Sequence, residues 1–227
     1  MFLYETHMHS SQTSACSSAP AEDLVRFYFD RGYTGAIITD HFINGNSSVT
    51  QHGSWAKRMA YFAAGYHAAK KTGNAIGFDV FFGLEFSIKG SDFLTYGIDT
   101  DFLDKNPDID KFPINKFSKI VRDYGGYIAQ AHPFRNEWYI ENKYPAAPEY
   151  LDGIEVFNAS MMHGANAEAN DMAREFALKH GLAMQAGSDI HCLGDGFTSG
   201  IILQKRAKNI FDIINEIKNG TAELLVP

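Results

Sequence analysis

The segment Gly35-Ala36-Ile37-Ile38-Thr39-Asp40-His41 is a short apolar run that ends in an acid and a histidine. A run of this length, bounded by turn residues, is typical of a strand that is buried on both faces. Similar apolar runs recur along the chain, at 3–6, 35–39, 79–84, 93–98, 127–131, 153–157, 182–187 and 200–203. Strands of this kind usually lie in a parallel sheet that is covered by helices, and we expect such a sheet here.

Amphipathic helices are predicted between most of these runs. The first begins near Pro20, and the second covers 54–72. Apolar residues at i, i+3, i+4 and i+7 predict three more helices, each followed by a glycine, around 117–124, 169–176 and 210–217. Seven or eight strand–helix units in one chain favour a closed barrel in a single domain, because a barrel leaves no strand edges.

The composition is that of a globular protein. Of 227 residues, 45% are hydrophobic and 21% are charged, which excludes a disordered chain. Two cysteines, Cys16 and Cys192, cannot build a disulfide framework and indicate a reducing compartment. The net charge of −7 disfavours general binding to nucleic acids or anionic membranes. The first residues resemble neither a targeting signal nor a membrane span, so we expect a cytoplasmic protein.

Histidines and carboxylates occur repeatedly where a predicted strand ends. The residues in question are His7, His9, Asp40, His41, Glu85, His132, Glu155, Asn158, Asp189 and His191. Because the carboxyl ends of parallel barrel strands share one face, these side chains are expected to converge on one pocket. Alternate residues of a strand point the same way, so His7 and His9 can bind one cation. The sequence therefore predicts a metal site, the alternative being a set of polar residues at loop edges. The remaining histidines, His52, His67, His163 and His180, are not expected to be ligands.

Seven segments of the chain resemble motifs of the PHP family (polymerase and histidinol phosphatase domains), whose members are metal-dependent phosphoesterases. They are Glu5-Thr6-His7-Met8-His9-Ser10, Ile38-Thr39-Asp40-His41, Gly83-Leu84-Glu85, Thr95-Tyr96-Gly97-Ile98-Asp99, Ala131-His132-Pro133-Phe134-Arg135, Glu155-Val156-Phe157-Asn158 and Gly187-Ser188-Asp189-Ile190-His191. They follow the family order over almost the whole chain. The resemblance implies an α/β fold, a distorted TIM-like (β/α)7 barrel, as a single PHP domain over 1–227.

The resemblance also implies a cluster of two or three divalent metal ions. The first ion would be held by His7, His9, Glu85 and Asp189. The second would be held by Glu85, a residue near position 92 and His132, and the third by His41, His191 and a residue in the loop after His9. Two cations a few Å apart can clamp a phosphate and activate a water molecule between them.

Two positions depart from the family pattern. Asp92 stands where the family often has a histidine, and as a ligand it would favour Mn²⁺ or iron over zinc. Alternatively, Asp92 is a solvated turn residue. The loop after His9 offers Cys16 as a soft ligand, which would favour zinc or iron and be sensitive to oxidation. Alternatively, Cys16 lies beside the metal, or the third ion is weakly bound or absent. Magnesium is less expected than zinc, manganese or iron.

A phosphate group needs a cation besides the metals, and Arg135 follows His132 by three residues. Its guanidinium suits phosphate oxygens, although a surface pair with Glu137 is the alternative. Asp189 and His191 are candidates for proton transfer, but metal ligands make poor free bases.

Other residues are expected to support the site. Asp40 is expected to orient His41 or another ligand, and Asn158 to hydrogen-bond a ligand or the substrate. The loops at 42–53 and 135–150 are expected to select the substrate. The second loop carries four aromatic residues on which a ring could stack, Trp138, Tyr139, Tyr144 and Tyr150.

The predicted function is hydrolysis of a small phosphomonoester, such as histidinol phosphate or a nucleotide, by a metal-activated hydroxide at a di- or trinuclear site. The alternatives are an amidohydrolase-like C–N hydrolase, a 3′–5′ exonuclease and a non-catalytic metal-binding module. Nucleic acid is not expected as a partner beyond a mononucleotide or a short 3′ end. The densest basic cluster, Lys205, Arg206 and Lys208, is better explained as a solvated surface.

Overall fold

The structure is a computed structural model that describes residues 1–138, 140–141, 144–162, 164–196 and 198–226. Tyr139 and His163, which the sequence analysis named, lie outside the described residues.

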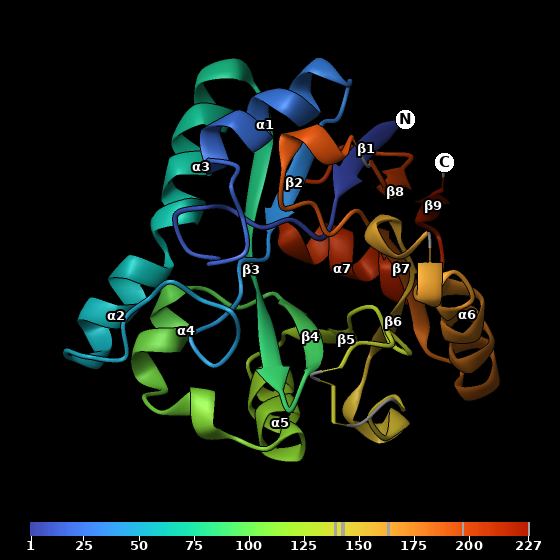
Figure 1. The fold of residues 1–227 in the computed structure, drawn as a ribbon. Coiled ribbons are helices and arrows are strands. Elements are labelled where there is room, and N and C mark those ends of the chain that lie inside the picture. Colours follow the sequence, from blue (N-terminus) through green and yellow to red (C-terminus); the bar gives the residue numbers. More distant parts are fainter. Residues whose placement is uncertain (139, 142–143, 163, 197, 227) are drawn as a thin grey trace.

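Within these ranges, nine strands form one sheet that curls into a nearly closed barrel (Figure 1). In spatial order they are β7 (Ala183–Gly187), β6 (Gly153–Asn158), β5 (Tyr127–Gln130), β4 (Ser91–Tyr96), β3 (Asp79–Ile88), β2 (Gly35–Ile38), β1 (Phe2–Glu5), β8 (Gly200–Leu203) and β9 (Glu223–Leu225). Strands β1, β2 and β3 pair in parallel, and so do β5, β6 and β7. The predicted α/β barrel is confirmed, but the expectation of a parallel sheet is wrong for β4 and β8, which pair antiparallel. Strand β9 was not predicted from the sequence and pairs antiparallel with β8.

A tight turn explains why β4 runs antiparallel to β3. Lys89 and Gly90 connect the two strands and have φ of 53° and 83°. Two central residues with positive φ match the right-handed twist of a hairpin, so the chain reverses here without a helix. Strand β3 consequently extends to Ile88, past the end expected at 84, and Ser87 pairs with Asp92.

The barrel closes at the carboxyl ends of its parallel strands. Met8 and Ile190 form a parallel bridge there. The backbone N–H of Asp189 donates to the carbonyl of His7 at 2.8 Å, and that of His9 donates to the carbonyl of Ile190 at 3.1 Å. At the opposite end β8 lies between β1 and β7. The first and last parallel strands are therefore neighbours where the predicted ligands lie.

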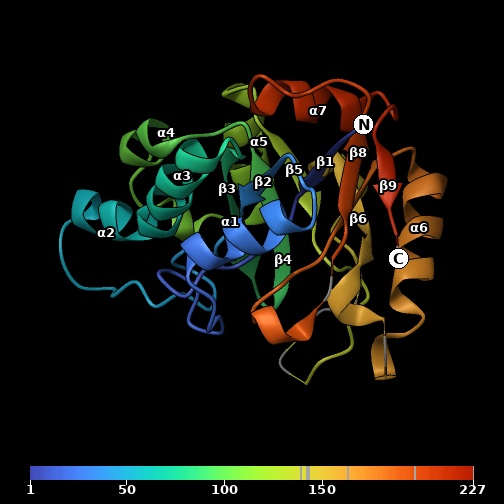
Figure 2. The same ribbon diagram turned by 90° about the horizontal axis from the view of Figure 1, so that it is seen from above.

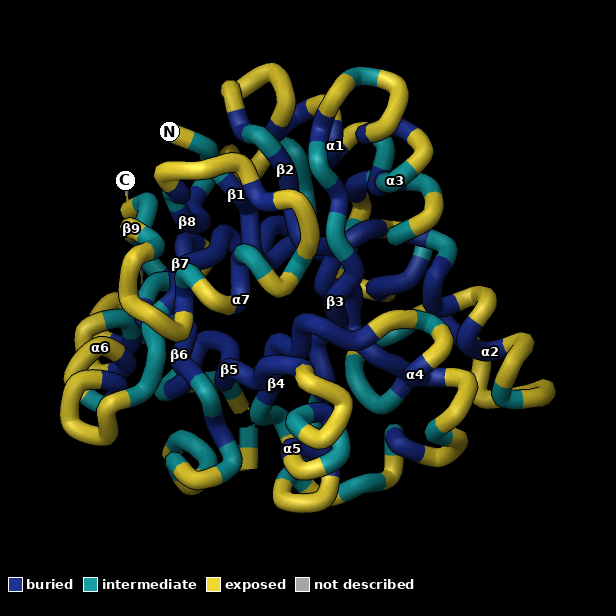
Figure 3. The backbone as a smooth tube through the Cα atoms, turned by 180° about the vertical axis from the view of Figure 1, so that it is seen from behind, coloured by how far each residue is buried: buried dark blue, intermediate teal, exposed yellow. Residues whose placement is uncertain are grey.

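Seven α-helices among the described residues cover the barrel, and Figure 3 shows their exposed outer sides around the buried strands. They are α1 (Ala21–Asp30), α2 (Trp55–Phe62), α3 (Ala64–Ile76), α4 (Thr100–Lys105), α5 (Ile114–Asp123), α6 (Ala169–His180) and α7 (Ile210–Lys218). Helix α7 lies across one end of the barrel (Figure 2), where its isoleucines pack against Tyr4, Tyr96 and Tyr127. That end is filled, which leaves the carboxyl ends of the parallel strands as the end for a site. None of the helices described here has both the length and the apolar character needed to cross a membrane.

The helix expected over 54–72 is two helices in the structure, α2 and α3. Helix α3 continues through Gly73, past the end expected at residue 72. A Cβ at Gly73 would lie within 2.8 Å of Phe78 and Val80, so this glycine serves close packing instead. The helix ends at Gly77, whose φ of 81° is the left-handed conformation of a helix C-cap.

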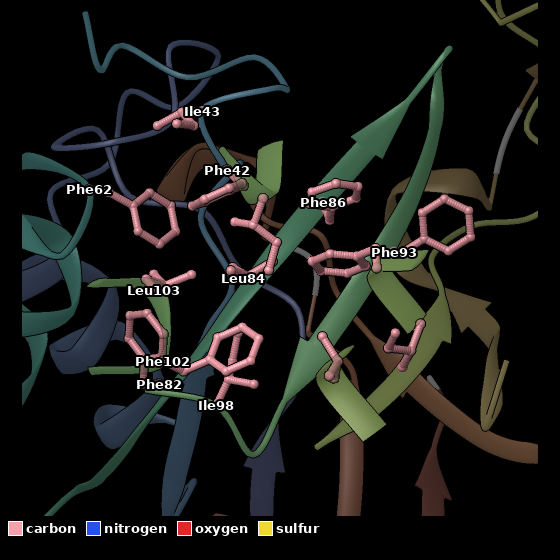
Figure 4. Close-up of a cluster of buried hydrophobic side chains, with 14 of the residues drawn as sticks. Phe42, Ile43, Phe62, Phe82, Leu84, Phe86, Phe93, Ile98, Phe102 and Leu103 are labelled. Carbon is pink, nitrogen blue, oxygen red and sulfur yellow. The ribbon is translucent and has the colours of Figure 1, made fainter. Parts of the chain in front are cut away.

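Strand β3 separates the core from the site because successive side chains point to opposite faces. Phe82, Leu84 and Phe86 point away from the barrel axis into a cluster with residues of α2, α4 and the hairpin (Figure 4). Burying each of these side chains contributes about 1.5–3 kcal/mol. Glu85 lies between them in the sequence and therefore faces the barrel interior, where it is fully buried.

Candidate metal centre

The open end of the barrel gathers predicted ligands from several strands. They include His7 and His9 after β1, Glu85 on β3, His132 after β5 and Asp189 after β7. All five side chains are at most 4% exposed. Burying so many ionisable groups is unfavourable unless hydrogen bonds, ion pairs or a metal ion compensate for the lost hydration.

Three overlapping groups of donor atoms among the described residues are close enough to hold a cation. Within each group the donor atoms lie within 4.8 Å of one another. The groups are His7–Glu85–His132, His7–His9–Asp189 and His9–His41–His191. Because His7 and His9 each belong to two groups, the candidate ion sites are contiguous.

Glu85 lies in the middle of the centre, and its carboxylate faces four imidazoles. Its Oε1 is 3.3 Å from Nε2 of His7 and 3.1 Å from Nε2 of His132. Its Oε2 is 3.5 Å from Nε2 of His9 and 2.6 Å from Nδ1 of His41. Within the described residues, neither this Oε2 nor Nδ1 of His41 has a partner in hydrogen-bond geometry, although both are buried. Such atoms require an explanation, and a metal ion fits this set of nitrogen and oxygen donors.

Two residues of the predicted ligand set have unusual backbone conformations. His132 and Asp189 have φ of 28° and 56°. Residues other than glycine rarely adopt positive φ, and the resulting strain is found most often at functional sites. Gly187 provides a close approach: a Cβ there would lie 2.5 Å from Cβ of His7 and 2.7 Å from Oε1 of Glu155. The strand ends are thus shaped to bring the side chains of β1, β6 and β7 together.

The carboxylates make this region favourable for positive charge. Burial alone would lower the pKa of His7. Nearby carboxylates outweigh burial and raise that pKa well above its usual value; they belong to Glu155, Asp189 and Glu85. Burial would raise the pKa of Glu85, but His41 and His7 lower it well below its usual value. A bound cation would compensate the negative charge of the same carboxylates.

Glu155, which the sequence left without a definite role, contacts two of the predicted ligands from behind. Its Oε1 is 2.8 Å from Nδ1 of His7, and its Oε2 accepts the backbone N–H of His132 at 2.9 Å. The same Oε2 accepts a hydrogen bond from Nδ2 of Asn158 at 2.8 Å, and this Nδ2 also donates to Oδ2 of Asp189 at 3.4 Å. A carboxylate on the far nitrogen of an imidazole orients the ring and raises its basicity as a ligand. A glutamate within an otherwise apolar strand was the available signal.

Asp92 and Arg135 lie at the edge of the centre. Oδ2 of Asp92 is 3.9 Å from Nε2 of His132, and its Oδ1 accepts the hydroxyl of Ser87 at 2.5 Å. Burial and the charge of Glu85 raise the pKa of Asp92. The guanidinium of Arg135 is 3.9 Å from Asp92 and 3.7 Å from the carboxylate of Asp189. Asp92 thus borders the group that contains His132 without belonging to it.

Cys16 lies against the imidazoles on the other side. Burial of the sulfur would raise the pKa of Cys16, but hydrogen bonds to His191 and His41 lower it to about 7. The loop is held in place by Ser17, whose hydroxyl donates to the carbonyls of His9 and His191 at 2.8 and 3.0 Å. The residue as a whole remains exposed, and its sulfur is not a member of the three donor groups.

Asp40 lies behind the imidazoles, and its carboxylate is buried. It accepts hydrogen bonds from the backbone N–H and hydroxyl of Ser10 at 2.5 and 2.7 Å, and from Ser14 at 2.8 Å. Ser14 in turn lies 3.2 Å from Nδ1 of His9. Neither serine was predicted to support the site, because a serine-rich loop carries no specific signal.

The comparisons with known proteins bear on the fold. No protein-family model matches the chain, and no curated protein matches it in sequence. Solved structures do match. One is a two-domain protein from Bacteroides vulgatus that contains a predicted PHP-like metal-dependent phosphoesterase, with a TM-score of 0.68 and 16% identity over 97% of this chain. This chain spans 63% of that protein's length. The chain has the fold of the PHP-like phosphoesterases.

Two further solved structures are similar in fold to this chain. PsfC from Pseudomonas syringae matches all of this chain and 91% of its own, with a TM-score of 0.65 and 15% identity. The lesion-specific endonuclease Q from Pyrococcus furiosus matches 98% of this chain and 57% of its own, with a TM-score of 0.61 and 12% identity.

A cleft of about 620 Å³ opens onto the metal centre of this PHP-like barrel. Its wall combines donors of the centre with residues of three loops and the hairpin: Cys16, His41, Asn44, Gly45, Asn46, Ser87, Gly90, Asp92, His132, Arg135, Trp138, Asp189 and His191. Trp138 is 93% exposed and contributes an aromatic surface to the wall. A cleft of this volume accommodates a small organic molecule.

Proposed function

We propose that this protein is a metal-dependent phosphoric ester hydrolase whose active site is the centre at the open end of the barrel. The observation that carries the proposal is the position of Glu85 between four imidazoles, with its Oε2 and Nδ1 of His41 buried 2.6 Å apart and, among the described residues, without a partner in hydrogen-bond geometry. When bound, divalent ions in such a centre polarise a phosphate ester and lower the pKa of a water molecule that attacks phosphorus.

The ligand assignment follows the donor groups and their neighbours. His7, His9, Glu85 and Asp189 would hold one ion, and Glu85, Asp92 and His132 a second. A third ion would be held by His41, His191 and Cys16. Imidazole, carboxylate and thiolate donors together favour zinc, manganese or iron over magnesium.

The chain's own groups bind and orient the phosphate. The guanidinium of Arg135 lies at the cleft wall within 4 Å of Asp92 and Asp189, so it can present its N–H groups to phosphate oxygens next to the ions. Glu155 and Asn158 hold the ligands behind, which keeps the donor atoms in place during turnover. Asp189 and His191 are secondary candidates for moving a proton to the leaving group.

A small phosphomonoester, such as histidinol phosphate or a nucleotide, is the proposed substrate class. Among the described residues that line the cleft, Arg135 is the one lysine or arginine. The chain carries a net charge of −7, which opposes binding of a long polyanion. A short nucleic-acid 3′ end is the second candidate, and the likeness in fold to an endonuclease supports its inclusion in the test.

The test begins with the metal content of protein purified without chelator. Two or three equivalents of transition metal are expected, with p-nitrophenyl phosphate hydrolysis that is lost on stripping and restored by Mn²⁺ or Zn²⁺. His132→Asn should lose metal and activity, whereas His52→Asn, which changes an exposed histidine, should lose neither. One equivalent or less with no turnover under any metal would contradict the proposal and favour a non-catalytic module. Turnover of amides but not of phosphate esters would favour C–N hydrolysis.

A further inference from the structure

Ser14 is a buried hydroxyl with three polar neighbours behind the metal centre. Its Oγ donates to Oδ1 of Asp40 at 2.8 Å and accepts the backbone N–H of His41 at 3.0 Å. The third neighbour is Nδ1 of His9, at 3.2 Å. The serine is 1% exposed and His9 is fully buried, so bulk water does not compete for these contacts.

Counting hydrogens determines which nitrogen of His9 is protonated. A hydroxyl has one hydrogen to donate and can accept two hydrogen bonds. The N–H of His41 can only donate, and the ionised carboxylate of Asp40, which also accepts two hydrogen bonds from Ser10, can only accept. The hydrogen of Ser14 therefore points to Asp40, and the remaining contact requires a hydrogen on Nδ1 of His9.

The other nitrogen of His9 then faces the centre as a bare lone pair. Its Nε2 lies 3.2 Å from Oδ1 of Asp189 and 3.1 Å from Nε2 of His7. Nδ1 of His7 is 2.8 Å from a carboxylate oxygen of Glu155, which likewise requires its hydrogen on Nδ1. Two lone pairs that face each other at this distance repel unless a cation or a shared proton lies between them.

We propose that Ser14 is a positioning residue that holds His9 in the tautomer with its hydrogen on Nδ1 and thereby presents Nε2 to the metal ions. The carboxylate that Ser14 bonds is closely packed: a Cβ on Gly65 of α3 would collide with Ser10 and Asp40. The same hydroxyl also holds the backbone of His41, so one side chain orients donors from two strands. The inference rests on the proposed function only for the metal that His9 would bind.

Two-dimensional ¹H–¹⁵N spectra of the histidine side chains test the tautomer directly, first in metal-free protein. Wild-type His9 should show a protonated Nδ1 and a bare Nε2, and Ser14→Ala should give a mixture of tautomers or the opposite one. Ser118→Ala is the matched control, because Ser118 of α5 is as buried as Ser14 but its hydroxyl donates to the carbonyl of Tyr150, outside the centre. Ser14→Thr keeps the hydroxyl and should keep the wild-type signature.

Zinc binding supplies the second measurement. Ser14→Ala should weaken the affinity for zinc by about 10–100-fold, as expected for an outer partner of a ligand, while Ser118→Ala should change it little. A hydrogen on Nε2 in the wild type would overturn the proposal even if Ser14→Ala does not fold. An unchanged tautomer and zinc affinity in a folded Ser14→Ala would also overturn it. Failure to bind any metal would overturn the proposed function and leave the tautomer result standing, because the spectra are recorded on metal-free protein.

Discussion

The metal centre has two halves with different chemistry. The carboxylate half contains Glu85, Asp92, His132, Asp189 and His7. The imidazole half contains His9, His41, His191 and the adjacent Cys16. Carboxylates raise the pKa of His7 well above its usual value, whereas burial and then His41 and His191 lower that of His9 well below. Neighbouring positions in one barrel mouth therefore offer a harder, more anionic site and a softer, more neutral one.

Glu85 joins the two halves, and Glu85→Gln is expected to have the largest effect. Glutamine is nearly the same size as glutamate, so the substitution removes only the negative charge that faces imidazoles of both halves. The loss of activity should exceed the ~10–100-fold cost of losing an outer partner of a ligand, and metal content should fall in both halves. Glu141→Gln, which changes an exposed glutamate paired with Lys89, is the control. Loss of a single equivalent of metal would show that Glu85 serves one half only.

Cys16→Ser should affect the imidazole half alone. A thiolate suits zinc better than a hydroxyl does, so we expect zinc affinity of this half to fall by about 10-fold, with the ions of the carboxylate half retained. In Co²⁺-substituted protein the near-ultraviolet thiolate charge-transfer band should also disappear. Cys192→Ser should change neither property. A Co²⁺ spectrum without that band in the wild type would place Cys16 beside the metal instead of on it.

The reactivity of Cys16 should follow its lowered pKa in metal-free protein. With a pKa of about 7, half of the thiol is ionised at pH 7, compared with about 3% for an ordinary cysteine of pKa about 8.5. Alkylation by iodoacetamide should therefore be about 15-fold faster at pH 7 than for an ordinary thiol and rise with pH to a plateau above 8. Mass spectrometry of the Cys192→Ser variant isolates the rate at Cys16. Bound zinc should protect Cys16 from alkylation. Equal alkylation rates with and without zinc would show that the thiol does not bind the metal.

Removal of metal should lower the thermal stability in two stages if the halves differ in affinity. An ion present at 100 times its dissociation constant adds about 2.7 kcal/mol to the stability of the folded state. For a chain of this size that corresponds to about 5–10 °C in Tm per ion. Scanning calorimetry during a chelator titration measures the stages. One transition that accounts for all the metal would mean that the two halves bind as a unit.

The sequence predicted the barrel and most of the donors because each donor directly follows an apolar run. His7, His132 and Asp189 could be placed in one pocket from that pattern alone. The antiparallel course of β4 was missed because it depends on the backbone conformation of Lys89 and Gly90, which apolar patterning does not report.

The supporting residues were harder to predict than the ligands. Glu155 stands out as an acid in an otherwise apolar strand but without a definite role, and Ser14 lies in a serine-rich loop that carries no specific signal. Their roles appear only when tertiary contacts place them behind His7 and His9 at hydrogen-bond distance. Patterning therefore identifies which residues surround an ion, but the residues that orient them depend on the folded geometry.

The bridge between Met8 and Ile190 has a consequence for how the protein is made. The group of His7, Glu85 and His132 is complete once the first 132 residues have left the ribosome. The other two groups each need a residue from the end of β7, Asp189 or His191, and so wait for almost the whole chain. An ion captured early can thus have only part of its final surroundings, and the last parallel strand completes the enclosure around it. The order of synthesis therefore allows the group of His7, Glu85 and His132 to bind an ion before the two groups that need Asp189 or His191.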